Sequence, residues 1–279
     1  MVGCIIQARN SSSRLPFKVA KELPFGSGLS LLEQVIRRVK RSALVDKIII
    51  ATTTEVIDDS IVEISKKEDV NFFRGSKENL LERYYLAASQ FQIDHIVRIT
   101  SDCPCIDPEI ITVCIREHIQ NNADYTSNSY NNRFIRGMDM EVVKFNVLKE
   151  AYMKAENDFQ KEHVTPYIYK DHSDLYKIHT VTAFDKFIDP TIRITVDTLE
   201  DYMLVGAVFD YLYNSNPYFG IKEITKLFAD KPWLNYINSS VPHKKVFSSF
   251  EEEKTEAIKL LEYFGLERVK SWINSGSPI

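Results

Sequence analysis

The sequence lacks the features that mark several large classes of protein. Its 279 residues contain no apolar stretch that approaches the ~20 residues of a membrane-spanning helix. Basic residues are not in excess, since the net charge is −4 and the isoelectric point lies near 5.9. Because binding to a phosphate backbone needs a basic face, we expect no nucleic-acid partner. The sequence also contains no internal repeat and no low-complexity linker.

Cysteine is scarce, and its spacing excludes two kinds of site. Cys4, Cys103, Cys105 and Cys114 form neither a CxxC pair nor a Cys/His cluster with zinc spacing. All four lie in or beside apolar runs, so we expect buried thiols in a reducing compartment. The apolar run from Val2 to Ile6 is too short for the core of a signal peptide. These observations predict a cytoplasmic protein without membrane association.

What is present is a regular alternation of short β-branched runs and helical patterns. Predicted strands cover Val2–Ala8, Lys47–Ala51, Val70–Phe73 and His95–Thr100. Predicted helices begin near Ser30, Asp58, Glu78 and Asp107, where capping residues precede apolar positions at helical spacing. This order predicts an α/β fold, with a mostly parallel sheet and helices on both faces. Ligands of such sheets bind beyond the carboxyl ends of the strands.

The second half of the chain is less regular. We expect strands at Met138–Val142, Tyr176–Ala183 and Ile192–Val196, helices capped by Asn146 and Asp158, and a helix over Leu199–Tyr213. Two short helices, Phe250–Phe264 and Leu266–Ile273, are expected in a charged tail. We therefore predict one domain over residues 1–240 and a helical extension over residues 241–279.

A cationic loop follows the first predicted strand. Arg9, Arg14 and Lys18 lie among three serine residues in the segment from Gln7 to Lys18. Such side chains, with the N–H groups of a loop, neutralise and bind phosphate oxygens. A solvated basic loop is the alternative interpretation of this composition. The loop is neither a GxGxxG nor a Walker sequence, so it does not predict either of those sites.

Two aspartates directly follow predicted strands that lie far apart in the sequence. Asp102 follows His95–Thr100, and Asp197 follows Ile192–Val196. Carboxylates at the open edge of a sheet suit Mg²⁺, which also binds substrate phosphates. Aspartate is also a frequent helix cap, so each residue alone has a structural interpretation.

Several motifs resemble those of one enzyme family. Six motifs, QARNSSSRLPFK, FRGSKENLLERY, SDCP, RGMDMEV, EHVTPY and RITVDT, resemble elements of the sugar cytidylyltransferases, in family order. The similarity is to the spore coat polysaccharide biosynthesis protein F group and to the related ketodeoxyoctonate and acylneuraminate enzymes. It covers residues 2 to about 215 and implies a Rossmann-like nucleotide-diphospho-sugar transferase fold. One position departs from the pattern, because Phe17 stands where relatives usually have a glycine that permits a close turn.

The resemblance implies a role for particular residues. Lys18, Asp102 and Asp197 would be catalytic, and both aspartates would hold Mg²⁺. The nucleotide CTP would contact Ala8, Arg9, Ser13, Arg14, Lys18, Thr52, Arg74 and Ser101. The second substrate, an acidic sugar, would contact Arg136, Glu141, His163 and Thr165. Arg83 and Tyr84 could equally pack a helix onto the core.

The implied reaction joins CMP from CTP to the anomeric hydroxyl of a ulosonic acid and releases pyrophosphate. A metal-dependent glycosyltransferase and a non-catalytic nucleotide-binding protein are the alternatives, although SDCP lacks the DxD motif of the former. The resemblance does not identify the sugar or the pathway. It also implies a homodimer, with a contact in the segment 130–170, which is rich in Tyr and Met.

Overall fold

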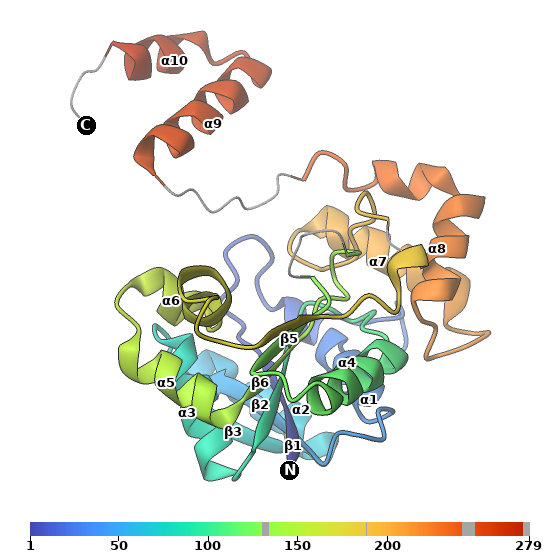
Figure 1. Cartoon of the computed structure of the whole chain (residues 1–279). Helices are drawn as coiled ribbons and strands as arrows, with labels where there is room; N and C mark the ends of the chain where they lie inside the picture. Colours follow the sequence, from blue (N-terminus) through green and yellow to red (C-terminus); the bar gives the residue numbers. More distant parts are fainter. Residues whose placement is uncertain (130–133, 188, 242–248, 276–279) are drawn as a thin grey trace. The chain divides into compact units, whose positions relative to one another are not determined.

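The computed structural model describes residues 1–129, 134–187, 189–241 and 249–275 (Figure 1). The chain divides into two compact units, Met1–Val241 and Pro242–Ile279. Each unit is described by itself, and the second contains the helices α9 (Phe250–Tyr263) and α10 (Glu267–Asn274). Among the described residues, no helix is long and apolar enough to span a bilayer.

The described part of the first unit is built on a seven-stranded sheet with the order β3-β2-β1-β4-β6-β5-β7. The strands are β1 (Val2–Gln7), β2 (Lys47–Thr53), β3 (Asn71–Gly75), β4 (His95–Thr100), β5 (Tyr125–Ser127), β6 (Glu141–Lys144) and β7 (Ile178–Thr180). Only β6 runs antiparallel to its neighbours, β4 and β5, and the other described pairs are parallel. The prediction of a mostly parallel mixed sheet is confirmed.

Helices cover both faces of the sheet. They are α1 (Leu31–Val39), α2 (Asp59–Lys67), α3 (Leu80–Gln90), α4 (Pro108–Gln120), α5 (Phe145–Lys154), α6 (Asp158–His163), α7 (Leu199–Leu212) and α8 (Ile221–Asp230). Shorter turns are the 3₁₀ segments Lys18–Ala20, Val56–Asp58, Asp185–Phe187 and Pro232–Tyr236 and the π-helical segment Tyr167–Asp171. Ile6 of β1 belongs to the core under α1, α2, α4, α7 and α8, whereas its neighbour Ile5 belongs to the core under α3 and α5. This alternation explains why strands buried on both faces read as continuous apolar runs.

The later strand predictions need correction. Residues 192–196 are not a strand and form a single bridge, between Arg136 and Arg193. Their backbone bonds go to loops instead, since Ile194 N donates to Arg136 O and Val196 N to Asp102 O. A run of five buried residues, four of them β-branched, therefore imitated a buried strand.

Neighbouring boundaries also differ from the sequence prediction. The strand expected from Met138 begins only at Glu141, because the Asn128 side chain bonds Met138 O and Met140 N, at 2.9 Å each. The strand expected over residues 176–183 is limited to β7, and β5 was not predicted. The helix assigned to an Asn146 cap begins at Phe145, and α6 is capped by Asn157 rather than Asp158.

A fully buried histidine joins α4 to the sheet. Nδ1 of His118 lies 2.9 Å from Thr126 Oγ1 in β5, and its Nε2 lies 3.2 Å from His95 Nδ1 in β4. Burial lowers the pKa of His118 to about 3, and the charges of His95 and Lys144 act in the same direction. The imidazole is therefore neutral in the folded protein at physiological pH.

This buried imidazole predicts a loss of stability in acid. In the unfolded chain His118 takes up a proton below roughly pH 6.5, but in the folded protein it stays neutral until the pH approaches 3. The contribution of His118 to the free energy of unfolding is therefore complete above roughly pH 6.5 and declines as the pH falls toward 3. The free energy of unfolding should decrease by up to about 2 kcal/mol between roughly pH 6.5 and pH 5 from this residue. Urea unfolding at several pH values measures the slope. His118→Gln should flatten it, and an unchanged slope in this variant would contradict the assignment.

Candidate active site

The site lies where β1 and β4 end at the carboxyl edge of the parallel strands. The loop after β1 supplies Lys18, the loop after β4 supplies Asp102, and the segment before α7 supplies Asp197. Lys18 Nζ donates to Asp102 Oδ2 at 2.9 Å, to Asp197 Oδ1 at 3.0 Å and to Val196 O at 2.8 Å. The structure thus brings together the three residues predicted to be catalytic.

The electrostatics of this triad favour the charged forms. Lys18 is only 8% exposed, and burial acts to lower its pKa, but the carboxylates of Asp102 and Asp197 outweigh burial and raise it. Burial likewise opposes ionisation of Asp197, whereas Lys18, Arg14 and Arg193 bring its pKa down to about 2. The pKa of Asp102 is also lowered, against burial, chiefly by Lys18. At neutral pH the site therefore holds a buried cation between two carboxylates.

A second ion pair fixes Asp197. Arg193 donates through NH2 to Asp197 Oδ2 and through Nε to Asp201 Oδ1, both at 2.9 Å. Asp201 is fully buried, forms a capping box with Thr198 at the start of α7, and accepts a 2.8 Å bond from Asn238 Nδ2. Arg193 and Asp201 were not among the predicted site residues, although the spacing of Thr198 and Asp201 is a capping-box signal.

The loop after β1 turns at an unusual residue. Phe17 has φ 55° and ψ 25°, the left-handed conformation that glycine adopts without cost. Its N–H bonds Asn10 O at 3.1 Å, and its side chain is 49% exposed. Asn10 in turn donates to Ile57 O and to Ser60 Oγ, which anchors the loop. The loop makes a positive-φ turn directly before Lys18 despite the absence of glycine.

The remaining residues assigned to the nucleotide fall into two groups. Arg9, Ser13 and Arg14 are exposed on the loop, and an NH2 group of Arg14 lies 3.1 Å from Asp197 Oδ1. Ala8, Thr52 and Ser101 are buried at the strand ends. Arg74 is already engaged, since its guanidinium donates to Thr53 O, Asp59 Oδ1 and Glu55 O at 2.6–2.8 Å. This arginine ties the end of β3 to the segment after β2.

Two buried polar groups near these strand ends have no partner within the described residues. Arg83 in α3 is 3% exposed, and its Nε and NH1 make no hydrogen bond; neither does Oγ1 of the fully buried Thr52. Burial lowers the pKa of Arg83 to about 10, with a contribution from the charge of Arg9, which places this guanidinium near the loop after β1. Leaving such groups unpaired is costly, so both suit a bound polar ligand.

The residues assigned to the sugar do not form one cluster. Glu141 accepts bonds from Arg98 NH1, Tyr125 OH and Thr165 Oγ1 at 2.9–3.1 Å, so Glu141 and Thr165 join in a buried network. His163 is half-buried against Phe159, with ring centroids 4.5 Å apart. Between His163 and Thr165, Val164 has φ 72° and ψ −56°, and Thr165 N bonds His163 O at 2.9 Å. This is a strained γ-turn around a β-branched residue, a kind of strain that concentrates at functional sites.

Arg136 belongs to a different part of the site. Its backbone pairs with the segment that carries Arg193, which places it next to the strand-like residues leading to Asp197. Asp139, which was not among the predicted site residues, lies beside it and accepts a 3.1 Å bond from Gly137 N. Burial raises the pKa of Asp139 to about 6, against the influence of Gly137 N–H and Arg136.

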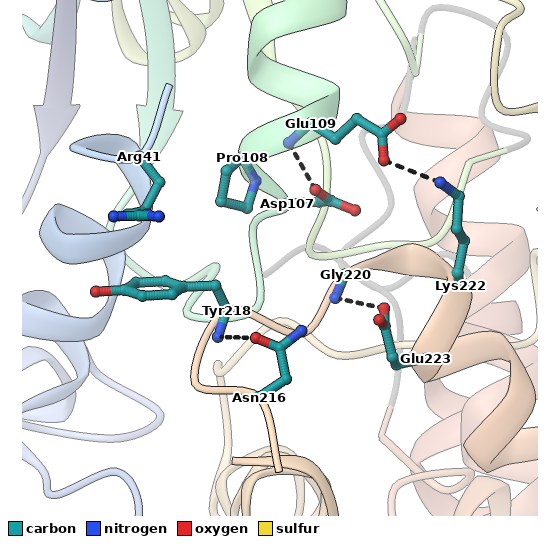
Figure 2. A pocket seen from close by; sticks show the side chains of 9 residues that line it. All are labelled: Arg41, Asp107, Pro108, Glu109, Asn216, Tyr218, Gly220, Lys222 and Glu223. Atoms are coloured by element: carbon teal, nitrogen blue, oxygen red, sulfur yellow. Dashed lines mark hydrogen bonds and ion pairs between the residues drawn. The ribbon is translucent and has the colours of Figure 1, made fainter. Parts of the chain in front are cut away.

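A separate hollow of about 410 Å³ lies at the N-termini of α4 and α8 (Figure 2). It is lined by Arg41, Asp107, Pro108, Glu109, Asn216, Tyr218, Gly220, Lys222 and Glu223. Asp107 caps both helices, accepting from Glu109 N at 2.7 Å and Ile221 N at 2.8 Å. Lys222 and Glu109 pair at 3.1 Å, as Figure 2 shows. None of the predicted site residues lines this hollow. Its lining residues cap the two helices and join them, so we interpret it as a junction between α4 and α8.

The donor set at the triad fits a magnesium ion. The described residues contain no group of three or more His, Cys, Asp or Glu side chains arranged to hold a metal. Mg²⁺ does not require one, because it is usually held by one or two carboxylates together with substrate phosphates and water. Asp102 and Asp197, both ionised and both within 3.0 Å of the same Lys18 ammonium, match this requirement.

A mostly parallel sheet whose carboxyl edge carries a cationic loop and paired aspartates suits a nucleotidyltransferase. Within that class, the chain belongs to the cytidylyltransferase family, whose model matches residues 3–247. It is 37% identical over 210 residues to the spore coat polysaccharide biosynthesis protein SpsF of Bacillus subtilis, a match covering 74% of this chain and 85% of that one. It is also 31% identical over 115 residues to a 3-deoxy-manno-octulosonate cytidylyltransferase of Pelobacter propionicus, a match covering 41% and 43% of the two chains.

A solved structure supports the same family. A cytidylyltransferase from Leptospira borgpetersenii superimposes with a TM-score of 0.77 and 31% sequence identity, covering 88% of this chain and 98% of that one. The family and the fold predicted from the sequence motifs are thereby confirmed.

The turn at Phe17 predicts an uncommon response to substitution. The left-handed conformation costs a residue with a Cβ about 1–2 kcal/mol. Phe17→Gly removes this cost, whereas Phe17→Ala keeps it. Both variants lose the same aromatic contacts. Because glycine also gains freedom in the unfolded chain, we expect Phe17→Gly to be more stable than Phe17→Ala by about 1 kcal/mol. Thermal and urea unfolding of the two variants provide the comparison, and an alanine variant of equal or greater stability would contradict it.

Proposed function

We propose that this enzyme transfers CMP from CTP to the anomeric hydroxyl of an acidic sugar of the ulosonic type and releases pyrophosphate. The observation that carries the proposal is the buried Lys18 ammonium held between Asp102 and Asp197 below the exposed Arg9 and Arg14. This arrangement offers both signs of charge that a metal–triphosphate complex needs. The similarity to the octulosonate cytidylyltransferase supports a sugar acid as acceptor.

In this proposal the exposed loop binds the phosphates. Arg9, Ser13 and Arg14 reach the triphosphate from solvent, and Ser101 lies at the end of β4 beside Asp102. The backbone at Ala8 reads the cytosine. Thr52 and Arg83 supply the unpaired hydroxyl and guanidinium groups for the base or ribose. Arg74, with its bonds already made, holds the neighbouring loop in place.

Asp102 and Asp197 would hold Mg²⁺. Bound there with the nucleotide, the ion supplies charge neutralisation and Lewis acidity at the phosphates. Lys18 keeps the two carboxylates together in the free protein, and it is placed to stabilise negative charge on the departing pyrophosphate. Arg193 prevents Asp197 from turning away.

The sugar binds beside the triad, where Arg136 pairs with its carboxylate. His163 and the strained turn at Val164 form another wall of the proposed pocket, while the buried pair of Glu141 and Thr165 supports that wall. The anomeric oxygen forms a bond to the α-phosphorus, and the bond from that phosphorus to the β-phosphate bridging oxygen breaks. We assign the acceptance of the hydroxyl proton to Asp139, because it lies beside the proposed sugar ligand Arg136 and close enough to Asp102 to feel its charge, and burial raises its pKa to about 6.

The proposal extends to the oligomeric state and the cellular role of the enzyme. Residues 130–133 of the expected dimer segment 130–170 lie outside the described residues. Of the Tyr and Met residues in the rest of it, Met138 and Tyr167 are buried in the chain's own core, whereas Met153 is 70% exposed. A two-fold contact there would therefore use the outer side of α5 around Met153. The similarity to a spore coat polysaccharide protein supports a role in the synthesis of surface polysaccharide, and the proposed substrates suit a cytoplasmic enzyme.

The triad predicts the effect of two conservative substitutions. Asp102→Asn and Asp197→Asn remove one negative charge each, so turnover of CTP should fall on the order of 100-fold or more at saturating Mg²⁺. The control is Asp94→Asn, at the opposite edge of the sheet, which should keep wild-type turnover. Pyrophosphate release gives the rates, and circular dichroism confirms folding. Near-normal turnover in either site variant would refute the two-carboxylate site.

The unpaired hydroxyl of Thr52 predicts opposite effects on stability and binding. Thr52→Val removes a group without a partner in the free protein, so stability should be unchanged or higher while CTP binds about 10-fold more weakly. Thr53→Val is the matched control, because the Thr53 hydroxyl already bonds Asp58 and its loss should reduce stability. Calorimetric titration and thermal unfolding measure the two effects. If Thr52→Val binds CTP as tightly as the wild type, Thr52 does not contact the nucleotide.

A further inference from the structure

Arg83 is a buried cation with unused hydrogen-bond donors. It lies in α3, is 3% exposed, and its Nε and NH1 have no hydrogen-bond partner within the described residues. By comparison, the fully buried guanidinium of Arg38 donates to Phe219 O at 2.7 Å and to Pro217 O at 3.2 Å. Buried donors that have lost water without gaining an acceptor are costly. The Arg83 side chain therefore suits a ligand that brings an acceptor.

The guanidinium of Arg83 lies where three neighbouring strands end. A methyl group added at Gly75, the last residue of β3, would lie 3.3 Å from Cγ of Arg83. The charge of Arg9 helps burial to lower the pKa of Arg83, and the charge of Asp58 acts against them, so both residues lie near the guanidinium. Arg9 follows β1 in the chain, and Asp58 follows β2. Arg83 is thus placed at the carboxyl ends of β1, β2 and β3, on the edge where ligands of such sheets bind.

The surroundings of Arg83 favour a neutral acceptor over an anion. Asp58 is 1% exposed, and its two carboxylate oxygens already accept from Asn10 N and from Thr53 Oγ1. A phosphate at this depth would lose its water beside a carboxylate of like charge. A carbonyl oxygen accepts a hydrogen bond from a guanidinium without adding a charge. The ligand group that fits best is therefore a carbonyl.

The other arginine at this end of the sheet is already engaged. Arg74 donates through Nε to Thr53 O and through NH2 to Glu55 O, at 2.8 Å each, and through NH1 to Asp59 Oδ1 at 2.6 Å. Its three nitrogen atoms thus hold the segment after β2. Arg83 is left with the donors that Arg74 has used.

The order of the strands indicates which part of the nucleotide reaches Arg83. The triad lies after β1 and β4, whereas β2 and β3 lie on the other side of β1. Neighbouring strands are ~4.8 Å apart, so the ends of β4 and β2 are separated by roughly 10 Å. The phosphates are proposed to bind at the triad and the loop after β1, and the sugar acid on the side of β6. The nucleoside then extends toward β2 and β3, with its base at Arg83.

We propose that Arg83 donates a hydrogen bond to the C2 carbonyl oxygen of the cytosine ring and thereby selects pyrimidine nucleotides. The assignment rests on the proposed use of CTP. Adenine carries only a hydrogen atom at C2, and guanine carries an amino group, which is itself a donor. A site built for an acceptor rejects both. Uracil has the same carbonyl, so Arg83 separates pyrimidines from purines, whereas the backbone at Ala8 is proposed to read the rest of the base.

Titration calorimetry of the full-length protein with CTP and 2-thio-CTP tests the contact. Sulfur replaces the C2 carbonyl oxygen in 2-thio-CTP and is a weaker acceptor, so the wild type should bind this analogue about 10-fold more weakly than CTP. Arg83→Met removes the donors and keeps an unbranched side chain. This variant should bind CTP about 10- to 100-fold more weakly than the wild type, and it should bind the two nucleotides equally. The advantage of CTP over ATP should shrink as well.

Thermal unfolding separates this contact from structural damage. Arg83→Met removes donors that have no partner in the free protein, so its melting temperature should equal or exceed that of the wild type. Arg38→Met is the matched control, because it removes a buried arginine whose bonds are made within the protein. Its melting temperature should fall, while its preference for CTP over 2-thio-CTP should stay at the wild-type value.

Two results would overturn the assignment. One is equal binding of CTP and 2-thio-CTP by the wild type, and the other is a wild-type preference for CTP that persists in Arg83→Met. A wild type that binds neither nucleotide would refute the proposed function and the assignment with it. If the predicted binding differences appear while no sugar acid is turned over, the base contact is supported and the proposed acceptor is the part that fails.

Discussion

The structure of this enzyme depends on one buried cation. Lys18, on the loop after β1, bonds Asp102 on the loop after β4 and Asp197 in the segment before α7. These two aspartates lie 84 and 179 residues from it in sequence. Without this ammonium, the half-buried carboxylates of Asp102 and Asp197 would repel each other with no cation between them. The same interaction that closes the fold at this edge therefore holds two negative charges where a metal-bound triphosphate is proposed to bind.

Support for the triad comes from a second layer of charge. Arg193, Asp201 and Asn238 fix Asp197 from the side of the protein, and the capping box of Thr198 and Asp201 connects this layer to α7. In this cluster the charges of three basic groups, Lys18, Arg14 and Arg193, balance those of three carboxylates, Asp102, Asp197 and Asp201. The rigid anchoring is consistent with the positive-φ turn at Phe17, since a strained residue persists only where its surroundings determine its conformation.

Sequence patterns predicted the first half of the fold because β1 and β2 are apolar runs buried on both faces, and the shorter runs of β3 and β4 are partly buried beside them. They predicted Ile192–Val196 as a strand because four of its five residues are β-branched, but its backbone bonds go to Asp102 and Arg136. The grouping of Lys18, Asp102 and Asp197 was implied by the resemblance to the cytidylyltransferases, while the rule that ligands bind at the carboxyl edge suggested only that the two aspartates could hold a metal. The unpaired groups of Thr52 and Arg83 were not predictable, because a missing hydrogen-bond partner is a property of packing and not of spacing.

The central claim is that this charged edge catalyses CMP transfer to a sugar acid. The most direct measurement is pyrophosphate release by the full-length enzyme with Mg²⁺, CTP and a panel of ulosonic acids, with UTP and neutral sugars in parallel. The account predicts release that requires both CTP and an acidic acceptor, with a CMP-sugar formed in equal amount. Release without an acceptor, equal rates with UTP, or no release with any sugar acid while a neutral sugar reacts would contradict it.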